Sequence, residues 1–172
     1  MGSCKAFGKE VLVVGVLSSD EELEHSARVE LEALHGPVET AVPRQLFTWS
    51  PYYDEEMGAP IWRSYWAFRD FVDPASLAAI KTATNTIERR LAIAGRRKVN
   101  LDPGLLAPGR FVLATTKDRA HRIALAQGIY AELTLIFERG EFRALPWTYP
   151  DWASEPVRSM LASWRHRLFA PR

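Results

Sequence analysis

The sequence lacks the features that define several common classes of protein. Its single cysteine, Cys4, excludes an intramolecular disulfide. Its longest apolar run, VLVVGVL at 11–17, falls far short of the roughly 20 residues that a transmembrane helix needs. The formal net charge is only +1, so no overall field attracts nucleic acid or an anionic membrane. We therefore expect one cytoplasmic domain over residues 1–172 that makes no membrane contact and begins with a flexible arm at 1–9.

Complete catalytic motifs are also missing. The chain contains no GxxxxGK[ST], GxGxxG, HExxH or GxSxG, and one cysteine cannot form a CxxC pair. The sequence therefore leaves open whether the protein is an enzyme and which reaction it would catalyse.

What the sequence does contain is an alternation of strand and helix patterns. Runs at 11–17 and 61–72 predict strands, and 37–49 reads as an extended edge segment. Helical spacing predicts one helix capped by Ser19, with Glu22 completing a capping box, and another that starts at Asp73-Pro74.

The C-terminal half reads as short strands between turn signals. Strand patterns occur at 97–101, 110–115, 120–125, 128–137 and 141–147, and DPG at 102–104 has the chemistry of a turn. A closing helix follows from Ser154. The order β-α-β-β-α-β predicts an α+β fold, a ferredoxin-like sandwich with an additional β-meander and a C-terminal helix. In such a sandwich both helices cover one sheet face and leave the other open.

Strict alternation along the C-terminal strands would gather polar side chains on that open face. In 129–137 it places Tyr130, Glu132 and Thr134 opposite the apolar set Ile129, Ala131, Leu133, Leu135 and Phe137. With apolar faces under the helices, the polar sets converge on one surface, joined by Arg63 and Tyr65 and rimmed by the TTKDRAHR loop at 115–122.

We expect this surface to bind a phosphorylated or otherwise anionic small molecule, such as a nucleotide. The candidates for acid, base or metal ligand are Asp102, Asp118, His121 and Glu132. The candidates for ligand binding are Arg97, Lys98, Asn100, Lys117, Arg119, Arg122, Tyr130, Tyr149 and Trp152, whose cations would hold the anion and whose rings would stack. A divalent ion such as Mg²⁺, Mn²⁺ or Zn²⁺ is one interpretation of the first set, and the sequence does not identify the metal.

Structural roles compete with these functional ones. Glu132 would serve equally as a cross-strand partner of an Arg or Lys, Asp102 as a turn former, and 117–119 as a solvated hairpin tip. The alternative function is a non-enzymatic module that uses an aromatic sheet face for RNA, a protein partner or a homodimer. The near-neutral charge counts against nucleic acid.

Long blocks of the chain resemble an uncharacterised bacterial family, a domain of unknown function of about this length. The resemblance runs from VLVVGVLSSDEE to the closing helix and rests on the blocks YYDEEMG, TNTIERRLAIAGRRKVNLDPG, RFVLATTKDRAHRI and GIYAELTLIFERGEFRALPWTYPDW. It implies a small, cytoplasmic, single-domain protein and carries over no activity.

Overall fold

The computed structural model describes residues 2–170, which form one eight-stranded sheet and five α-helices. The first half of the chain contains β1 (Glu10–Ser18), α1 (Glu21–His35), β2 (Val38–Leu46), α2 (Asp54–Met57), β3 (Trp62–Val72), α3 (Leu77–Arg90) and β4 (Val99–Ala107). The second half contains β5 (Arg110–Thr115), β6 (Arg122–Ala124), β7 (Tyr130–Glu138), β8 (Glu141–Ala144), α4 (Pro150–Ala153) and α5 (Glu155–Arg165). The predicted α+β class is confirmed.

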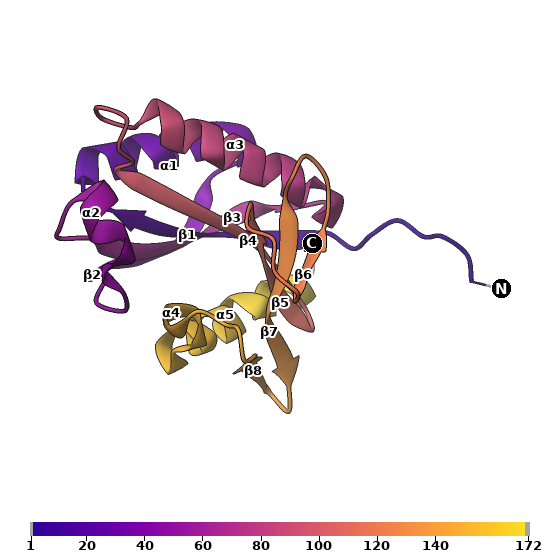
Figure 1. Ribbon diagram of the computed structural model, residues 1–172. Coiled ribbons are helices and arrows are strands. Elements are labelled where there is room, and N and C mark those ends of the chain that lie inside the picture. The colour runs from indigo at the N-terminus through magenta and orange to yellow at the C-terminus, as the bar shows by residue number, and fades with distance from the viewer. Residues whose placement is uncertain (1, 171–172) are drawn as a thin grey trace.

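The sheet is antiparallel, with strand order β2-β3-β1-β4-β5-β7-β6. The edge strand β8 pairs with the far end of β7. In Figure 1, β5 and β7 run steeply across the direction of β1 and β3, so the sheet is strongly twisted along its width.

Helices α1 and α3 cover one face of the sheet (Figure 1). Leu12, Val14 and Val16 of β1 meet Leu31 and Ile80 of the helices in a single buried cluster. The start of α1 differs from the prediction: Asp20, not Ser19, is the N-cap, and its carboxylate accepts a hydrogen bond from the Leu23 amide at 3.0 Å. The shift arises because the Ser19 hydroxyl instead donates to the Met57 carbonyl at 2.7 Å.

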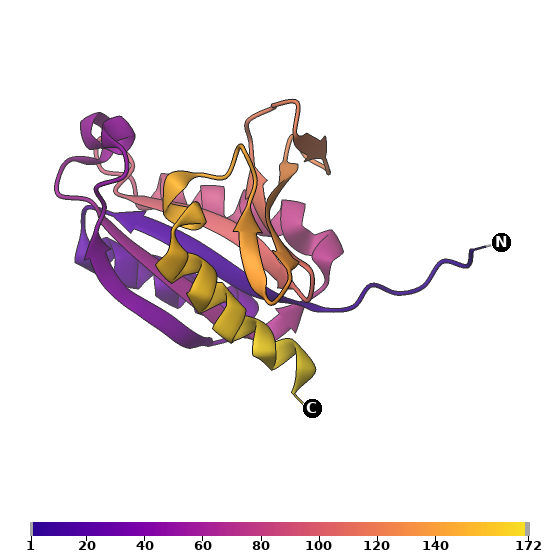
Figure 2. The same ribbon diagram turned by 90° about the horizontal axis from the view of Figure 1, so that it is seen from below.

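The opposite face of the sheet is not open, and that expectation was wrong. Figure 2 shows α5 running diagonally across it. Leu161 and Trp164 of α5 join Val13, Tyr65 and Phe111 of the sheet in a second buried cluster. The closing helix α5 is amphipathic, and it buries its apolar stripe against this face of the sheet.

A β-bulge in β7 breaks the alternation that the sequence predicted. Val112 of β5 pairs with Leu133, yet its neighbour Phe111 pairs with Leu135, so β7 carries one extra residue at Thr134. Leu135 therefore joins the cluster under α5 instead of lying with Leu133. Strict alternation misplaced Leu135 because one inserted residue reverses the side-chain phase of everything after it.

The sequence DPG at 102–104 is not a turn, which is a second correction. Asp102, Pro103 and Gly104 lie inside β4, paired with Gly15, Val14 and Val13 of β1. The turn that follows lies farther on, between Ala107 and Arg110.

Residues 2–9 have no regular secondary structure and extend away from the body of the protein (Figure 1). The flexibility expected of this arm stays a prediction. None of the helices within residues 2–170 combines the length and apolar character needed to cross a bilayer.

Candidate functional site

A cavity of about 510 Å³ lies where β4 and β5 separate. β4 pairs with β1 from Val99 to Leu106, but it pairs with β5 only from Gly104 to Ala107. We call the gap between residues 99–103 of β4 and residues 114–115 of β5 the fork. Side chains from α3, β7, the 47–53 segment and the start of α4 complete the walls of the cavity.

Helix α3 takes over the bonding that a neighbouring strand would give at the fork. The Lys81 ammonium donates to the Leu101 carbonyl at 2.8 Å, and the Leu101 amide donates to Glu88 Oε1 at 2.8 Å. Lys81 and Glu88 are both buried and lie 3.6 Å apart. Burial raises the pKa of the Glu88 carboxyl, against the opposing effect of Lys81. These two side chains satisfy both backbone groups of Leu101, which the missing strand leaves unpaired.

Pro103 suits the same edge of β4. In an antiparallel sheet successive residues direct their backbone groups to opposite neighbours. The Lys98 carbonyl accepts from the Ser19 amide at 3.1 Å, so even-numbered residues of β4 face β1 and odd-numbered ones face the fork. Residue 103 therefore faces the fork, where a proline leaves no N–H group unbonded.

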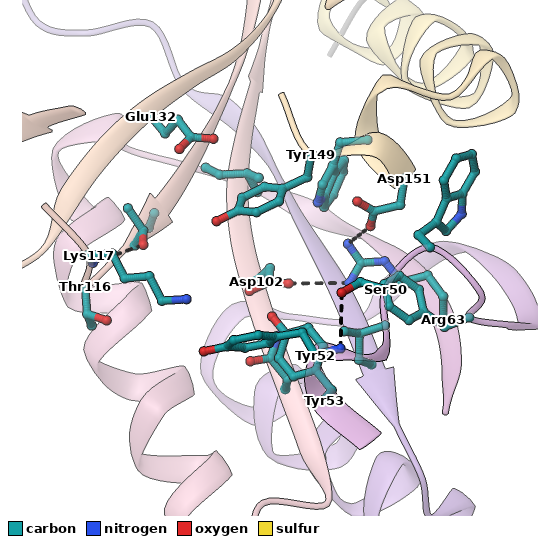
Figure 3. Close-up of a pocket in the computed structure, with 18 of the residues that line it drawn as sticks. Ser50, Tyr52, Tyr53, Arg63, Asp102, Thr116, Lys117, Glu132, Tyr149 and Asp151 are labelled. Carbon is teal, nitrogen blue, oxygen red and sulfur yellow. Dashed lines mark hydrogen bonds and ion pairs between the residues drawn. The ribbon is translucent and has the colours of Figure 1, made fainter. Parts of the chain in front are cut away.

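A buried guanidinium ties the start of α4 to the sheet. Arg63 of β3 contacts Asp151 of α4 at 2.6 Å and Asp102 of β4 at 3.4 Å (Figure 3). It also lies 4.9 Å from the ring centre of Tyr65 and 5.2 Å from that of Trp152. Burial favours the neutral guanidine, but Asp151 and the other neighbours outweigh it and raise the pKa of Arg63.

Gly15 makes room for this arrangement. A Cβ at residue 15 would lie 2.5 Å from Trp152 Cζ2 and 3.1 Å from an Arg63 nitrogen. The glycine in the run VLVVGVL therefore lets Trp152 and Arg63 approach the backbone of β1 closely.

Glu132 of β7 is the centre of a second cluster of polar side chains beside the fork. Its Oε2 accepts from Arg122 Nε at 2.7 Å and lies 3.1 Å from His121 Nε2, and Trp147 stacks on the His121 ring at 4.8 Å. Arg122 also donates to the Tyr149 hydroxyl at 3.3 Å. Burial lowers the pKa of Arg122, but the hydrogen bonds to Glu132 and Tyr149 and the charges of these groups outweigh it, so the pKa is raised. Glu132 thus has the cross-strand partner that its structural interpretation expected.

Arg97 fixes the orientation of the buried Asn100. The guanidinium contacts both carboxylate oxygens of Glu56, at 2.6 and 2.7 Å, and donates to Asn100 Oδ1 at 2.9 Å. The hydrogen bond to Glu56 is the main reason that the pKa of Arg97 is raised. The amide nitrogen of Asn100 has no hydrogen-bond partner within residues 2–170.

Lys117 differs from the other cations that line the cavity. Arg63, Lys81, Arg97 and Arg122 each contact a carboxylate. Within the described part of the chain Lys117 has no such partner, and its ammonium lies 5.0 Å from the ring centre of Tyr52. Figure 3 shows this ammonium and the Tyr149 hydroxyl directed into the same space.

Aromatic rings form much of the wall and the mouth of the cavity. Trp49, Tyr52 and Tyr149 are exposed at the mouth, while Tyr53 and Trp152 lie deeper. Burial, reinforced by the Asp102 carboxylate, raises the pKa of the Tyr53 phenol, so this hydroxyl stays protonated.

The structure brings most of the sequence-predicted site residues to this cavity. Those that line it are Arg97, Asn100, Asp102, Lys117, Arg122, Glu132, Tyr149 and Trp152. Five others lie outside its lining. His121 contacts Glu132, Lys98 donates to the Met57 carbonyl, Asp118 and Arg119 are exposed in the loop after β5, and Tyr130 lies half-buried at the start of β7.

Asp102, Asp118, His121 and Glu132, for which a metal site was one interpretation, do not form a group within residues 2–170 that could hold an ion. Across residues 2–170, no three His, Cys, Asp or Glu side chains are grouped so that they could hold one. Asp118 is exposed on its loop, and Asp102 pairs with Arg63 while Glu132 pairs with Arg122. Each acidic group that was expected to bind a metal therefore has a different environment.

Sequence reasoning missed Lys81 and Glu88 of α3 and Asp151 of α4, which also line the cavity. Lys81 and Glu88 are seven positions apart, so they share one side of α3, and both follow members of its apolar stripe. Charged residues at buried helical positions were the signal that could have identified them. Asp151 gave no comparable signal, because its partner Arg63 is remote in sequence.

Comparison with known proteins supplies a family but no activity. No curated protein and no solved structure matches the chain. One family matches residues 8–168, which include every strand and helix described above. The chain therefore belongs to the family described as Domain of unknown function (DUF4416).

Proposed function

We propose that this protein binds a small anionic molecule that carries a planar ring, such as a nucleotide, in the fork cavity. The observation that carries the proposal is the Lys117 ammonium, which points into the cavity with no carboxylate partner among residues 2–170 (Figure 3). The other lining cations are compensated within the protein. An anion would give Lys117 the partner that the chain itself does not supply.

The size and lining of the cavity support a small-molecule ligand. Its volume of about 510 Å³ falls within the range of roughly 300–1,000 Å³ typical of such sites. Tyr52 and Tyr149 offer ring faces at the mouth, next to Lys117 and Arg122. A planar ring would stack on these faces while its anionic substituent contacts the cations.

The alternative function, a module that binds RNA or a protein, needs an exposed aromatic sheet face, and that face is covered. Tyr65 and Phe111 lie on that face, but Trp152 and α5 cover them. The exposed rings lie at the mouth of the cavity instead.

We also propose that β1, α1, β2, β3, α3 and β4 form a ferredoxin-like unit that carries this site. The antiparallel order β2-β3-β1-β4 and the position of both helices on one face support that assignment.

Binding of a defined panel tests the proposed function. Wild-type protein should be titrated calorimetrically with inorganic phosphate, pyrophosphate, ribose 5-phosphate and the common nucleoside mono-, di- and triphosphates, with and without Mg²⁺. At least one nucleotide should bind, and Lys117→Ala should weaken it at least tenfold. Arg119→Ala is the matched control, because Arg119 is an exposed cation on the same loop that does not line the cavity. Absence of binding across the panel, or equal losses in the two variants, would contradict the proposal.

A further inference from the structure

Asn100 and Asp102 form a polar pair on the wall of the fork cavity. They lie two residues apart on β4, so their side chains share one face of the strand. Asn100 is only 4 % exposed, whereas the Asp102 side chain is 28 % exposed. The pair therefore runs from a buried position toward the open cavity.

The orientation of the Asn100 amide follows from its partner. A guanidinium only donates hydrogen bonds, so the atom that faces Arg97 is the carbonyl oxygen Oδ1. Arg97 is itself held by two hydrogen bonds to Glu56. The Nδ2 amino group must then point elsewhere, and it is buried without a partner from residues 2–170. A buried donor in this state costs free energy unless something accepts from it.

Asp102 offers the complementary chemistry. Among the described residues the one hydrogen bond to its carboxylate comes from Arg63, at Oδ2 and at the long distance of 3.4 Å. The carboxylate retains acceptor capacity for an N–H or O–H group in the cavity. Asn100 and Asp102 together present a fixed donor beside an acceptor.

We infer that Asn100 and Asp102 recognise the hydrogen-bonding edge of a nitrogen heterocycle, which makes the ligand a nucleotide in preference to a sugar phosphate. This inference rests on the proposed function, in which Lys117 contacts the anionic group. The ring edge supplies an acceptor to Asn100 Nδ2 and a donor to Asp102, and the phosphate lies toward the mouth at Lys117 and Arg122. A sugar phosphate satisfies the cations but leaves Asn100 Nδ2 without a planar acceptor.

Asn100→Asp is the sharpest variant for this inference. It keeps the oxygen that accepts from Arg97 and replaces the Nδ2 donor by an oxygen of nearly the same size. Asn85→Asp is the matched control, because Asn85 lines the same cavity from α3 and the substitution adds the same charge. Asp102→Asn tests the second member of the pair independently while keeping an oxygen for Arg63.

The experiment measures the affinities of four nucleoside 5′-monophosphates (AMP, GMP, CMP and UMP) and of ribose 5-phosphate by titration calorimetry. In wild type at least one nucleotide should bind tenfold or more tightly than ribose 5-phosphate. Asn100→Asp should lower the affinity for that nucleotide at least tenfold, and Asp102→Asn should lower it at least fivefold. Both should leave ribose 5-phosphate within twofold, and Asn85→Asp should preserve the preference.

The outcomes separate the two proposals. If nucleotides bind and their advantage survives both Asn100→Asp and Asp102→Asn, the inference about the polar edge is wrong and the proposed function stands. If ribose 5-phosphate binds as tightly as every nucleotide, the inference also fails. If none of the five compounds binds, the inference is overturned, and the di- and triphosphates of the wider panel decide the proposed function. Thermal unfolding of each variant without ligand shows whether Asn100→Asp still folds. If it does not, the nucleotide preference of Asp102→Asn alone tests the inference about the polar edge.

Discussion

Both halves of β4 pair with β1 on one side, but they have different partners on the other side. From Gly104 to Ala107 the strand is hydrogen-bonded to β5, as in an ordinary sheet. From Val99 to Pro103 the bond to β5 is absent, and Lys81 and Glu88 of α3 bond to the backbone of Leu101. The comparison teaches that a sheet can open internally and create a cavity when side chains replace the bonds of the lost neighbour.

The largest expected effect comes from removing that replacement. Glu88→Ala leaves the Leu101 amide without its acceptor and the buried Lys81 ammonium without its carboxylate partner. We expect a loss of about 3–5 kcal/mol in the free energy of unfolding, measured by urea denaturation. Glu22→Ala, at an exposed position of α1, should change it by less than about 0.5 kcal/mol.

A double variant sharpens this result. Lys81→Met combined with Glu88→Leu removes both charges, so it should cost less than the two single changes to alanine added together. A strictly additive cost would show that the two side chains do not act as a pair.

Glycine substitutions compare the two halves directly. A Cβ at residue 104, in the paired half, would lie 2.6 Å from Phe111 Cζ and 2.7 Å from the Val112 carbonyl oxygen. Gly15, opposite Asp102 in the open half, has Trp152 as its nearest obstacle. Gly104→Ala and Gly15→Ala should each destabilise the protein by about 1–3 kcal/mol in urea denaturation.

The two glycine variants should differ in their spectra. Gly15→Ala should change the near-ultraviolet circular dichroism, because it displaces the Trp152 indole, whereas Gly104→Ala acts chiefly on Phe111. A Gly15→Ala protein as stable as wild type would show that Trp152 does not press on β1.

A smaller effect is expected from pH. Burial raises the pKa of the Glu88 carboxyl above its ordinary value of about 4.5. A carboxyl whose pKa is higher in the folded than in the unfolded state contributes stability below the unfolded pKa, and this contribution is lost as pH rises through the folded pKa. Glu88→Gln lacks the contribution. We therefore expect the difference in free energy of unfolding, wild type minus Glu88→Gln, to fall as pH rises from below about 4.5 toward neutrality. Urea denaturation at several pH values would measure this difference. A difference that rises with pH would contradict the burial of this carboxyl.

The smallest effect is expected at Pro103. Because its position faces the fork, Pro103→Ala adds an N–H group without breaking a bond of the sheet. The main cost is the greater entropy of the unfolded chain, about 0.4–1 kcal/mol by thermal denaturation. Leu105→Pro, on the bonded side of the same strand, should be far more damaging because it removes a bond to β5.

Local signals predicted much of the fold. Apolar spacing identified both long helices, and strand patterns identified β1 and β3, including the position of Tyr65 on the face away from α1 and α3. The bulge at Thr134 and the position of Asp102-Pro103-Gly104 inside β4 were not predictable in the same way. Both depend on pairing with remote strands, which overrides the local preference of DPG for a turn.

The candidate site was predictable where residues lie on strands or the loop beside the fork. Asn100, Asp102, Lys117 and Glu132 were identified from alternation and composition, and all line the cavity. The contribution of Lys81 was not identified, because the apolar spacing of α3 accounts for its buried side by packing alone. A charged side chain that bonds to a distant backbone leaves only a weak trace in a single sequence.

The bonds that Lys81 and Glu88 make to Leu101 also bear on whether another chain could add a strand at the fork. An unpaired stretch of strand is normally a template on which another chain can add a strand. In the open half of β4 the backbone groups of Leu101 are already occupied, and Pro103 has no N–H group to offer. The cavity can therefore stay open to a small molecule, while this edge of β4 offers few free backbone groups to which an extended peptide could bond.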